Sequence, residues 1–392
     1  MDMQAGIGAA RTRETGRVKA SRATNWALVA LFLGFLCVPG VTQIATLSAP
    51  AVPDRGLAPP PQWMGFSRLR DLAKATDAYI EDHFGLRRQL VRWNSLVRYR
   101  LGVSSTPQVV IGKDDWLFYA YAPEKIMEQH TGANVFTPAE LERWVAVMTA
   151  NRDWLARRGI AFYVLIAPDK STIYPEKLPT YPRPAERTTR ADQLVERLKR
   201  TDLVLIDPRH ALVDAKASTR PFFEGDSHWT EAGAYVAYRQ LMERVRETFL
   251  SLRPAAPEDY AIAPGRGPND QAFLLGLGDD LTYTVERWTR RATHQIRTTT
   301  RTPAPGDPWG WPVRFVETDL KDQPRALIFG DSFTDYVLGP TFLYETFRDP
   351  VITHHNGGTF DFRLVEEAKP DLVIVQLAER YLASPPQPPV GF

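Results

Sequence analysis

The chain has a single cysteine, Cys37, among its 392 residues. One cysteine excludes an intramolecular disulfide and a zinc site that needs several thiolates. Because Cys37 lies in the most apolar stretch of the chain, it gives no soluble cysteine nucleophile either. With 48 basic and 46 acidic residues, the chain also lacks the basic excess that nucleic-acid binding requires. We therefore expect no nucleic acid among its partners.

The N-terminus carries the clearest targeting signal. A basic segment, 1–24, precedes an apolar run in which Trp26–Val38 has no charged residue. A basic flank of this kind stays in the cytoplasm while the apolar run enters the membrane. We expect 1–24 to be a cytoplasmic tail and 25–47 to be a signal anchor that crosses the membrane once. Since the strictly apolar core is only about 13 residues long, a cleavable signal peptide with a site at Ala49–Ala51 stays an alternative.

Either interpretation exports the rest of the chain, and we expect it to face the periplasm from a bacterial inner membrane. Residues 48–62 are rich in proline and predict an extended linker. The domain that follows, 63–392, has ample length for a large core. At its start, Phe66–Arg100 has helical spacing, and 109–120 predicts two short paired strands around a turn.

Apolar runs then alternate with helical patterns. Thr137 and Glu140 form a capping-box pattern for one helix, and a second long helix is expected at Thr230–Phe249. Runs typical of buried parallel strands lie at 160–168, 203–207, 326–332, 350–356 and 371–378. This alternation predicts a three-layer α/β/α domain with a parallel sheet. An irregular insertion, 252–323, interrupts the pattern, with short strands expected only around Val285–Arg301.

Ser332 is the first candidate for chemistry. It follows an apolar strand in the sequence Gly-Asp-Ser and precedes a helical segment. Ligands of open α/β sheets bind beyond the carboxyl ends of the strands, and the N–H groups at the start of the next helix face that edge. Ser332 therefore has the position of a nucleophile.

Asp226 and His228 can activate such a serine, which needs a base and a group that orients the base. They stand two residues apart in an extended segment, so their side chains point to the same side. Asp226 is expected to hold one ring nitrogen of His228, which leaves the other to take the proton of Ser332. We predict that these three side chains meet at the carboxyl edge of the sheet.

Each signal also has a simpler explanation. Gly-Asp-Ser after a strand is often only a turn, and Asp226 or Ser227 could simply cap the helix that follows. Asp226, His228, His354 and His355 have the residue types of a metal site, but that hypothesis leaves Ser332 without a role. We therefore expect neither a metal nor a cofactor.

Several segments of the exported part carry a family resemblance. In chain order they are GKDDWLFY, LIAPDKSTIYPEKLP, GDSHWTEAGAY, GDSF and PDLVIVQLAERYL. They resemble motifs of the alginate O-acetyltransferase family (AlgJ/AlgX type), whose domain has an SGNH-hydrolase-like fold, although Asp115 replaces a glycine that this family usually has. The resemblance implies Ser332 as nucleophile, His228 as general base and Asp226 as its orienting partner. It also implies an acetyl-enzyme that a sugar hydroxyl resolves.

Other residues are candidates for binding an oxyanion or a substrate. The Ser332 N–H is expected to bind an oxyanion, with Asn356 or the Gly357 N–H as a second donor, unless that segment is only a polar loop. Lys170 and Arg380 are candidates for contact with an acidic sugar or the acyl donor, or else for pairing with surface charges.

Tryptophans are candidates for contact with a saccharide. Trp229 is predicted either to flank the site as a sugar platform or to belong to the core. Trp309 and Trp311 lie in a proline- and glycine-rich loop and are further candidates.

These interpretations predict a membrane-anchored, periplasm-facing O-acetyltransferase that acts on an exopolysaccharide. The resemblance implies a membrane-bound O-acyltransferase as its partner, because acetyl-CoA is not expected outside the cytoplasm. The same side chains could serve a polysaccharide O-acetyl esterase, and a non-catalytic polysaccharide-binding assembly protein could keep the fold. The sequence leaves open the polysaccharide, the acetylated hydroxyl and the oligomeric state.

Overall fold

The computed structural model describes residues 22–46, 58–63, 65–83, 86–179, 188–291, 295–303, 312–354 and 360–386. The chain divides into two compact units, Met1–Trp93 and Asn94–Phe392.

The N-terminal unit is helical in its described part. Its elements are α1 (Arg22–Thr46), η1 (Phe66–Arg68), α2 (Leu69–His83) and the first half of α3 (Arg87–Arg100). The Ala58 N–H donates to Asp82 Oδ2 at 2.9 Å and ties the segment before η1 to the end of α2. The helices α2 and α3 confirm the helical spacing of 66–100. Within the described ranges, no helix combines the length and the hydropathy that a membrane span requires.

A seven-stranded sheet forms the centre of the C-terminal unit. Its strands, in spatial order, are β4 (Val204–Ile206), β3 (Ala161–Ala167), β11 (Leu372–Ala378), β9 (Arg325–Gly330), β10 (Arg348–His354), β8 (Val313–Glu317) and β7 (Arg297–Arg301). The strands from β4 to β10 are parallel to one another. They are the strands that the apolar runs predicted.

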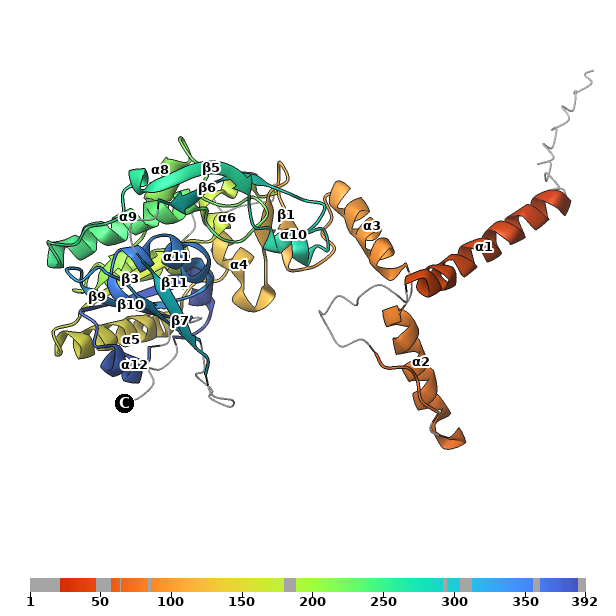
Figure 1. Cartoon of the computed structure of the whole chain (residues 1–392), viewed down its shortest axis with the longest axis horizontal. Helices are drawn as coiled ribbons and strands as arrows, with labels where there is room; N and C mark the ends of the chain where they lie inside the picture. The colour runs from red at the N-terminus through yellow and green to blue at the C-terminus, as the bar shows by residue number, and fades with distance from the viewer. Residues whose placement is uncertain are drawn as a thin grey trace, which may run out of the picture. The chain divides into compact units, whose positions relative to one another are not determined.

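Helices cover both faces of this sheet. α5 (Pro138–Ala156) and α12 (Phe362–Ala368) pack on one face, and α9 (Glu231–Thr248) packs on the other (Figure 1). The side chains of β11 alternate between the two cores: Ile374 lies on the α9 side, and Val373 lies on the α5 side. The predicted three-layer α/β/α architecture is therefore confirmed.

Shorter elements connect these layers. They are η2 (Ala122–Glu124), α4 (Ile126–Thr131), α6 (Lys170–Ile173), η3 (Pro175–Lys177), α7 (Arg190–Leu198), α8 (Arg209–Ala215), η4 (Pro257–Asp259), η5 (Thr334–Leu338), α11 (Gly339–Thr341), η6 (Leu343–Glu345) and η7 (Glu379–Ala383).

The two long helices, α5 and α9, begin at the capping residues that the sequence patterns predict. Thr137 and Glu140 form the capping box of α5. The Thr230 hydroxyl accepts a hydrogen bond from the Gly233 N–H at 3.1 Å and caps α9. A Cβ at Gly233 would lie 2.0 Å from the carbonyl oxygen of Pro221. Glycine therefore lets the first turn of α9 pack directly against the chain that precedes Asp226.

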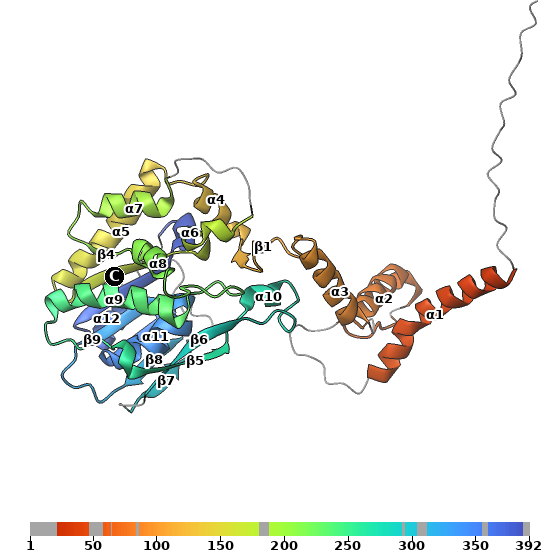
Figure 2. The same ribbon diagram turned by 90° about the horizontal axis from the view of Figure 1, so that it is seen from above.

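The segment 252–323 is more regular than the sequence predicts. β5 (Tyr260–Arg266) and β6 (Thr284–Arg290) form an antiparallel hairpin with α10 (Asp270–Leu274) in its connection. Figure 2 shows this hairpin beside α9 and α11. β8 and β7 then extend the main sheet in antiparallel pairing. The short strands expected around Val285–Arg301 are β6 and β7, whereas the expectation of irregular structure was wrong for β5, α10 and β8. β5 contains a proline and a glycine, which are uncommon inside strands, so its sequence does not predict a strand.

The first hairpin explains why Asp115 can stand where a glycine is usual. β1 (Val109–Ile111) pairs with β2 (Leu117–Tyr119), as predicted. In the turn between them, Asp114 and Asp115 have φ of 54° and 62°. Aspartate tolerates this left-handed region better than most residues. The Asp115 carboxylate also accepts a hydrogen bond from Tyr99 Oη at 2.6 Å, which anchors the turn.

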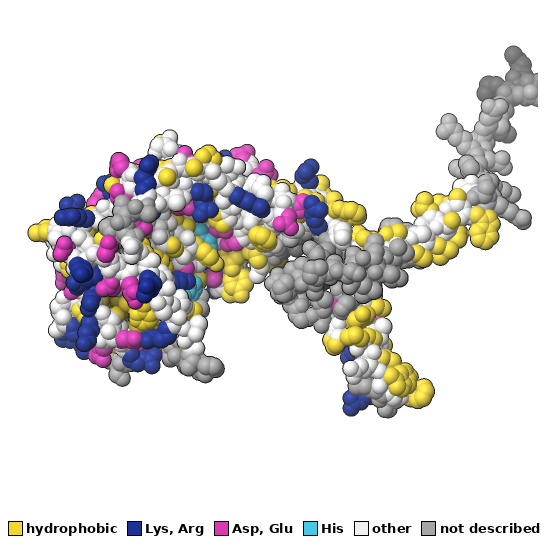
Figure 3. All heavy atoms as spheres, viewed as in Figure 1, with side chains coloured by type: hydrophobic (Ala, Val, Ile, Leu, Met, Phe, Trp, Pro, Cys, Tyr) yellow, Lys and Arg dark blue, Asp and Glu magenta, His cyan; other side chains and the backbone are white. Residues whose placement is uncertain are grey.

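The surface carries charges of both signs. Basic and acidic side chains are interspersed over the face shown in Figure 3, which agrees with a formal net charge of +2. Along α1 the exposed side chains are mainly hydrophobic, among them Trp26, Leu31 and Phe32.

Candidate active site

Asp226, His228 and Ser332 meet at the carboxyl edge of the sheet. His228 Nε2 lies 2.8 Å from Ser332 Oγ, and His228 Nδ1 lies 2.7 Å from Asp226 Oδ1. The two hydrogen bonds use opposite nitrogens of one imidazole ring. The predicted meeting of these three side chains is therefore confirmed as a contact.

Ser332 is held by the turn between β9 and η5. Gly330 ends β9, and a Cβ there would lie 2.4 Å from Thr334 Oγ1. Asp331, fully buried, accepts hydrogen bonds from the Phe333 N–H at 2.9 Å and from the Ala378 N–H at 2.5 Å. Burial raises the pKa of Asp331. These contacts fix the serine between the end of β9 and the neighbouring end of β11.

The Asp226 carboxylate has three hydrogen-bond donors. Oδ1 accepts from Nδ1 and from the backbone N–H of His228, the latter at 3.0 Å, and Oδ2 accepts from the Asp270 N–H at 3.1 Å. Burial alone would raise the pKa of Asp226, but these bonds and the charge of His228 lower it to about 2. The group is therefore a carboxylate at neutral pH, so Nδ1 carries the hydrogen and Nε2 can accept the proton of Ser332.

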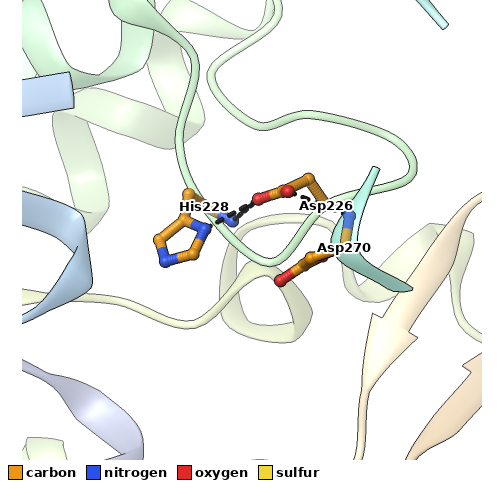
Figure 4. A group of neighbouring side chains, drawn as sticks. All are labelled: Asp226, His228 and Asp270. Atoms are coloured by element: carbon orange, nitrogen blue, oxygen red, sulfur yellow. Dashed lines mark hydrogen bonds and ion pairs between the residues drawn. The ribbon is translucent and has the colours of Figure 1, made fainter. Parts of the chain in front are cut away.

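Asp270 is a second acid in the site that the sequence patterns did not indicate. Its carboxylate accepts hydrogen bonds from the Ser227 N–H at 3.0 Å and from Ser227 Oγ at 2.7 Å. Burial and the neighbouring Asp226 raise the pKa of Asp270. Figure 4 shows Asp270 beside the Asp226–His228 pair.

Potential metal ligands are already engaged in hydrogen bonds. Ligand atoms of Asp226, His228 and Asp270 lie within 4.8 Å of one another, as a divalent cation would require. However, His228 Nδ1 is bonded to Asp226, so it would have to give up that bond to bind a metal. Of the alternative metal set, His354 Nδ1 pairs with Asp335, and His355 lies outside the described residues.

A pocket of about 340 Å³ opens beside the imidazole. Tyr336 stands at this pocket with 69% of its surface exposed, and its ring centroid lies 4.9 Å from that of His228. The pocket is lined by Phe223, Asp226, His228, Pro268, Asp270, Arg287, Tyr336 and Val337. A larger groove of about 1080 Å³ runs beside the edge strand β4, but none of the three contacting side chains lines it. The smaller pocket is lined by two of the three contacting side chains, Asp226 and His228.

Of the predicted oxyanion donors, the Ser332 N–H lies in the described part of the chain. Among the described residues, the Ser332 N–H has no hydrogen-bond acceptor, whereas the Phe333 N–H is bonded to Asp331. Asn356 and Gly357, the predicted second donors, lie outside the described residues, as do Trp309 and Trp311.

Trp229 is not a sugar platform. Its side chain is fully buried, and its Nε1–H donates to the Phe333 carbonyl oxygen at 3.1 Å. The indole ring packs edge-on against Phe333 with centroids 5.0 Å apart. Trp229 therefore belongs to the core and supports the turn that carries Ser332.

Lys170 and Arg380 do not reach a substrate either. Lys170 is 3% exposed and Arg380 is 4% exposed, which excludes both surface pairing and contact with a sugar. Arg380 pairs with Asp169 at 3.4 Å and with Glu124 at 3.9 Å. Burial opposes its charge, but Asp169 and Glu124 raise the pKa of Arg380 above its usual value. The sequence identified Lys170 and Arg380 as basic residues near the site, but it did not predict that both side chains are buried.

Two lining residues were missed for different reasons. Tyr336 stands four residues after Ser332, so helical spacing alone could have placed it on the same face. Asp270 could not have been found in this way, because it lies in α10, within the segment whose fold the sequence did not predict.

Comparison with known proteins identifies the family of the chain. Residues 109–364 match the family described as SGNH hydrolase-like domain, acetyltransferase AlgX. The probable alginate O-acetylase AlgJ of Pseudomonas aeruginosa is 26% identical over 340 residues, which cover 83% of this chain and 77% of that protein. AlgJ of Pseudomonas putida is 27% identical over 337 residues, covering 79% of this chain and 80% of that protein.

One solved structure has a similar fold. Bacillus cereus PatB1 superposes with a TM-score of 0.50 and 15% identity over 69% of this chain and 96% of that chain. The O-acetyltransferase domain of Pseudomonas putida AlgJ superposes with a TM-score of 0.47 and 19% identity over 72% of this chain and 94% of that chain. Since the family match spans more than half of its residues, this chain belongs to the AlgX-type family of acetyltransferases with an SGNH hydrolase-like domain.

Proposed function

We propose that this chain is an O-acetyltransferase that transfers acetyl groups to hydroxyls of a polysaccharide through an acetyl-Ser332 intermediate. The observation that carries the proposal is the chain of two hydrogen bonds, 2.8 Å from Ser332 Oγ to His228 Nε2 and 2.7 Å from His228 Nδ1 to Asp226 Oδ1. Membership of an acetyltransferase family supports the nature of the transferred group.

The first half-reaction forms the acetyl-enzyme. Ser332 Oγ attacks the carbonyl carbon of the acetyl donor while His228 Nε2 takes the hydroxyl proton. The tetrahedral intermediate carries an oxyanion, which we assign to the Ser332 N–H as one donor. The bond to the donor then breaks, and the imidazolium returns the proton to the leaving group. Asp226 stabilises the transient positive charge on the ring and keeps its orientation.

The second half-reaction passes the acetyl group to a sugar. A hydroxyl of the acceptor gives its proton to His228 Nε2 and attacks the acetyl-serine, and Ser332 is released when the proton returns to its Oγ. We assign Tyr336 as an acceptor platform, because its exposed ring stands beside the imidazole at the mouth of the pocket. The names of the AlgJ relatives favour alginate or a related exopolysaccharide as the acceptor.

Location and donor complete the proposal. Residues 25–47 would anchor the chain in the inner membrane with the domain in the periplasm, which the basic flank and the apolar run support. A membrane-bound O-acyltransferase would then supply the acetyl group. Carbonate extraction of membranes tests the anchor. The full chain is expected in the pellet and a variant that lacks 1–47 in the supernatant, and recovery of both in the supernatant would contradict it.

Product analysis tests the activity. The full chain is incubated with an activated acetyl ester and an oligosaccharide of the acceptor class, and acetylated sugar and free acetate are measured by mass spectrometry. We expect acetylated sugar as the main product. Free acetate alone would indicate an esterase that uses the same side chains. Equal product rates for the native chain and Ser332→Ala would contradict catalysis by this site.

A further inference from the structure

Lys170 occupies an unusual position behind the active-site loop. Its Nζ lies 3.0 Å from the carbonyl oxygen of Phe223, 3.0 Å from that of Glu224 and 2.7 Å from that of Asp226. A fourth acceptor, Gln271 Oε1, lies at 2.9 Å. Three carbonyl oxygens of one short loop therefore converge on a single ammonium group.

The surroundings of Lys170 keep this group out of water. The side chain is 3% exposed, and Nζ lies 5.4 Å from the ring centroid of Phe118 and 5.8 Å from that of Trp116. Both aromatic residues belong to the Gly-Lys-Asp-Asp-Trp-Leu-Phe hairpin, whose Leu117 N–H also donates to Glu224 at 2.9 Å. Burial lowers the pKa of Lys170 to about 7, against the opposing charges of Asp270 and Asp226. The four acceptors around Nζ favour the ammonium form, because a neutral amine has only two N–H groups to donate.

Residues of α10 and Tyr283 hold the loop as well. The Gln271 N–H donates to the Gly225 carbonyl oxygen at 3.1 Å, and the Asp270 N–H donates to Asp226 Oδ2 at 3.1 Å. A Cβ at Gly225 would lie 2.0 Å from the ring of Tyr283, so the loop has no room to shift in that direction. Lys170 supplies the cationic group among the residues that hold this loop.

We propose that Lys170 is a positioning residue for the acid–base pair, because its ammonium group draws the carbonyl oxygens of residues 223–226 together and so sets the distance from Asp226 to His228. The inference rests on the proposed function. Without the cation, three carbonyl dipoles would point at one another across an apolar space, and the loop would open to relieve their repulsion. Asp226 would then move, since its own carbonyl is the nearest of the three.

Lys170→Met is the direct test, because methionine keeps the length and apolar stem of the side chain but removes the charge and every donor. We expect kcat for acetyl transfer to fall about 100-fold, the loss that a displacement of about 1 Å causes in an active site. KM for the acetyl donor should change by less than about threefold, since Lys170 lies outside the substrate pocket. Lys177→Met is the matched control: Lys177 pairs with Asp114 at the surface, and its loss should leave kcat unchanged.

Proton NMR provides a readout that a loss of stability alone would not move. In the native protein the Nδ1 hydrogen of His228, bonded to Asp226, should give a single strongly downfield resonance. We expect this resonance to shift or disappear in Lys170→Met and to remain in Lys177→Met. Gln271→Leu removes one acceptor but leaves the three loop carbonyls on Nζ, so it should reduce kcat by less than about threefold.

Several outcomes would overturn the inference. A Lys170→Met protein with the kcat and the downfield resonance of Lys177→Met would do so. If Lys170→Met does not fold, Lys170→Arg is the test variant. A guanidinium keeps the positive charge, but its planar group is too large to donate to three carbonyl oxygens from one nitrogen. A folded Lys170→Arg with native kcat would contradict the geometric role, and failure of both variants to fold would make Lys170 a folding residue only. Ser332→Ala in the same assay separates these results from failure of the proposed function, which would leave Ser332→Ala active.

Discussion

Ser332 Oγ and His228 Nε2 lie 2.8 Å apart, but different parts of the structure hold Ser332 and the Asp226–His228 pair in place. Ser332 is fixed by its immediate neighbours, through Gly330, Asp331 and the adjoining strand end at Ala378. The acid–base pair lies on an irregular loop that Lys170 and α10 hold from other parts of the chain. The nucleophile therefore depends on a strand-to-helix turn within the main sheet, whereas its base depends on a loop that segments outside the sheet hold in place.

Removal of the nucleophile should have the largest effect. Ser332→Ala eliminates the only atom that can carry the acetyl group in the proposed mechanism, so the transfer rate should fall by about 10⁴-fold or more. Initial rates with an activated acetyl ester measure this loss. Ser218→Ala, which changes an exposed serine that does not line the pocket, is the control and should keep the native rate. A Ser332→Ala rate within tenfold of native would contradict the assignment.

Disruption of the acid–base pair should have the next largest effect on the rate. Asp226→Asn places an amide beside His228 Nδ1, and an amide donor there favours the tautomer with its hydrogen on Nε2, which cannot accept the serine proton. We expect a loss of about 10³-fold in kcat. Asp270→Asn keeps the backbone N–H that bonds Asp226 and should cost less than about tenfold. The reverse order of these two effects would show that Asp270 is the orienting acid.

The turn of the nucleophile can be broken without touching Ser332. Asp331→Ala leaves the buried N–H groups of Phe333 and Ala378 without their acceptor. We expect the free energy of unfolding to fall by about 2–4 kcal/mol, which urea denaturation followed by circular dichroism measures. Asp361→Ala, which removes an exposed hydrogen bond to the Arg363 N–H, is the control. An equal loss for both variants would show that the turn is not held as described.

Protonation of Asp226 at low pH should lower the free energy of unfolding. The pKa of Asp226 is lowered to about 2 in the folded chain, so its ionised form stabilises the fold fully above the unfolded pKa of about 3.9 by about 2 kcal/mol. This contribution is lost as pH falls through about 2. Unfolding free energies measured between pH 5 and pH 2 should therefore fall more steeply for the native chain than for Asp226→Asn. Identical slopes would contradict the lowered pKa.

The smallest predicted effect is on KM and comes from Tyr336, which lines the pocket. Tyr336→Ala removes an exposed ring beside His228 and should raise KM for the oligosaccharide about threefold to tenfold, with little change for the acetyl donor. Tyr336→Phe keeps the ring and should behave like the native chain. If both variants raise KM equally, the hydroxyl and not the ring contacts the acceptor.

The same contrast explains what the sequence could predict. Ser332 and Asp226–His228 could be located because a strand followed by Gly-Asp-Ser, and an i, i+2 pair, are local patterns with local geometry. Lys170 and Arg380 were assigned to the surface or to substrate, and Trp229 was left open between a sugar platform and the core. Their burial depends on which distant segments cover them, and no local pattern carries that information. β5 and α10 escaped prediction because their own sequences are weak signals: β5 contains a proline and a glycine, and α10 is a helix of 5 residues.

Trapping of the acetyl-enzyme tests the central claim most directly. The full chain is mixed with an activated acetyl ester, quenched in acid before acceptor is added, and digested for peptide mass mapping. We expect the mass of one acetyl group on the peptide that contains Ser332, and its disappearance with formation of acetylated sugar when oligosaccharide is added before the quench. An acetyl group that never appears on Ser332, or that persists there when acceptor is present, would contradict the account.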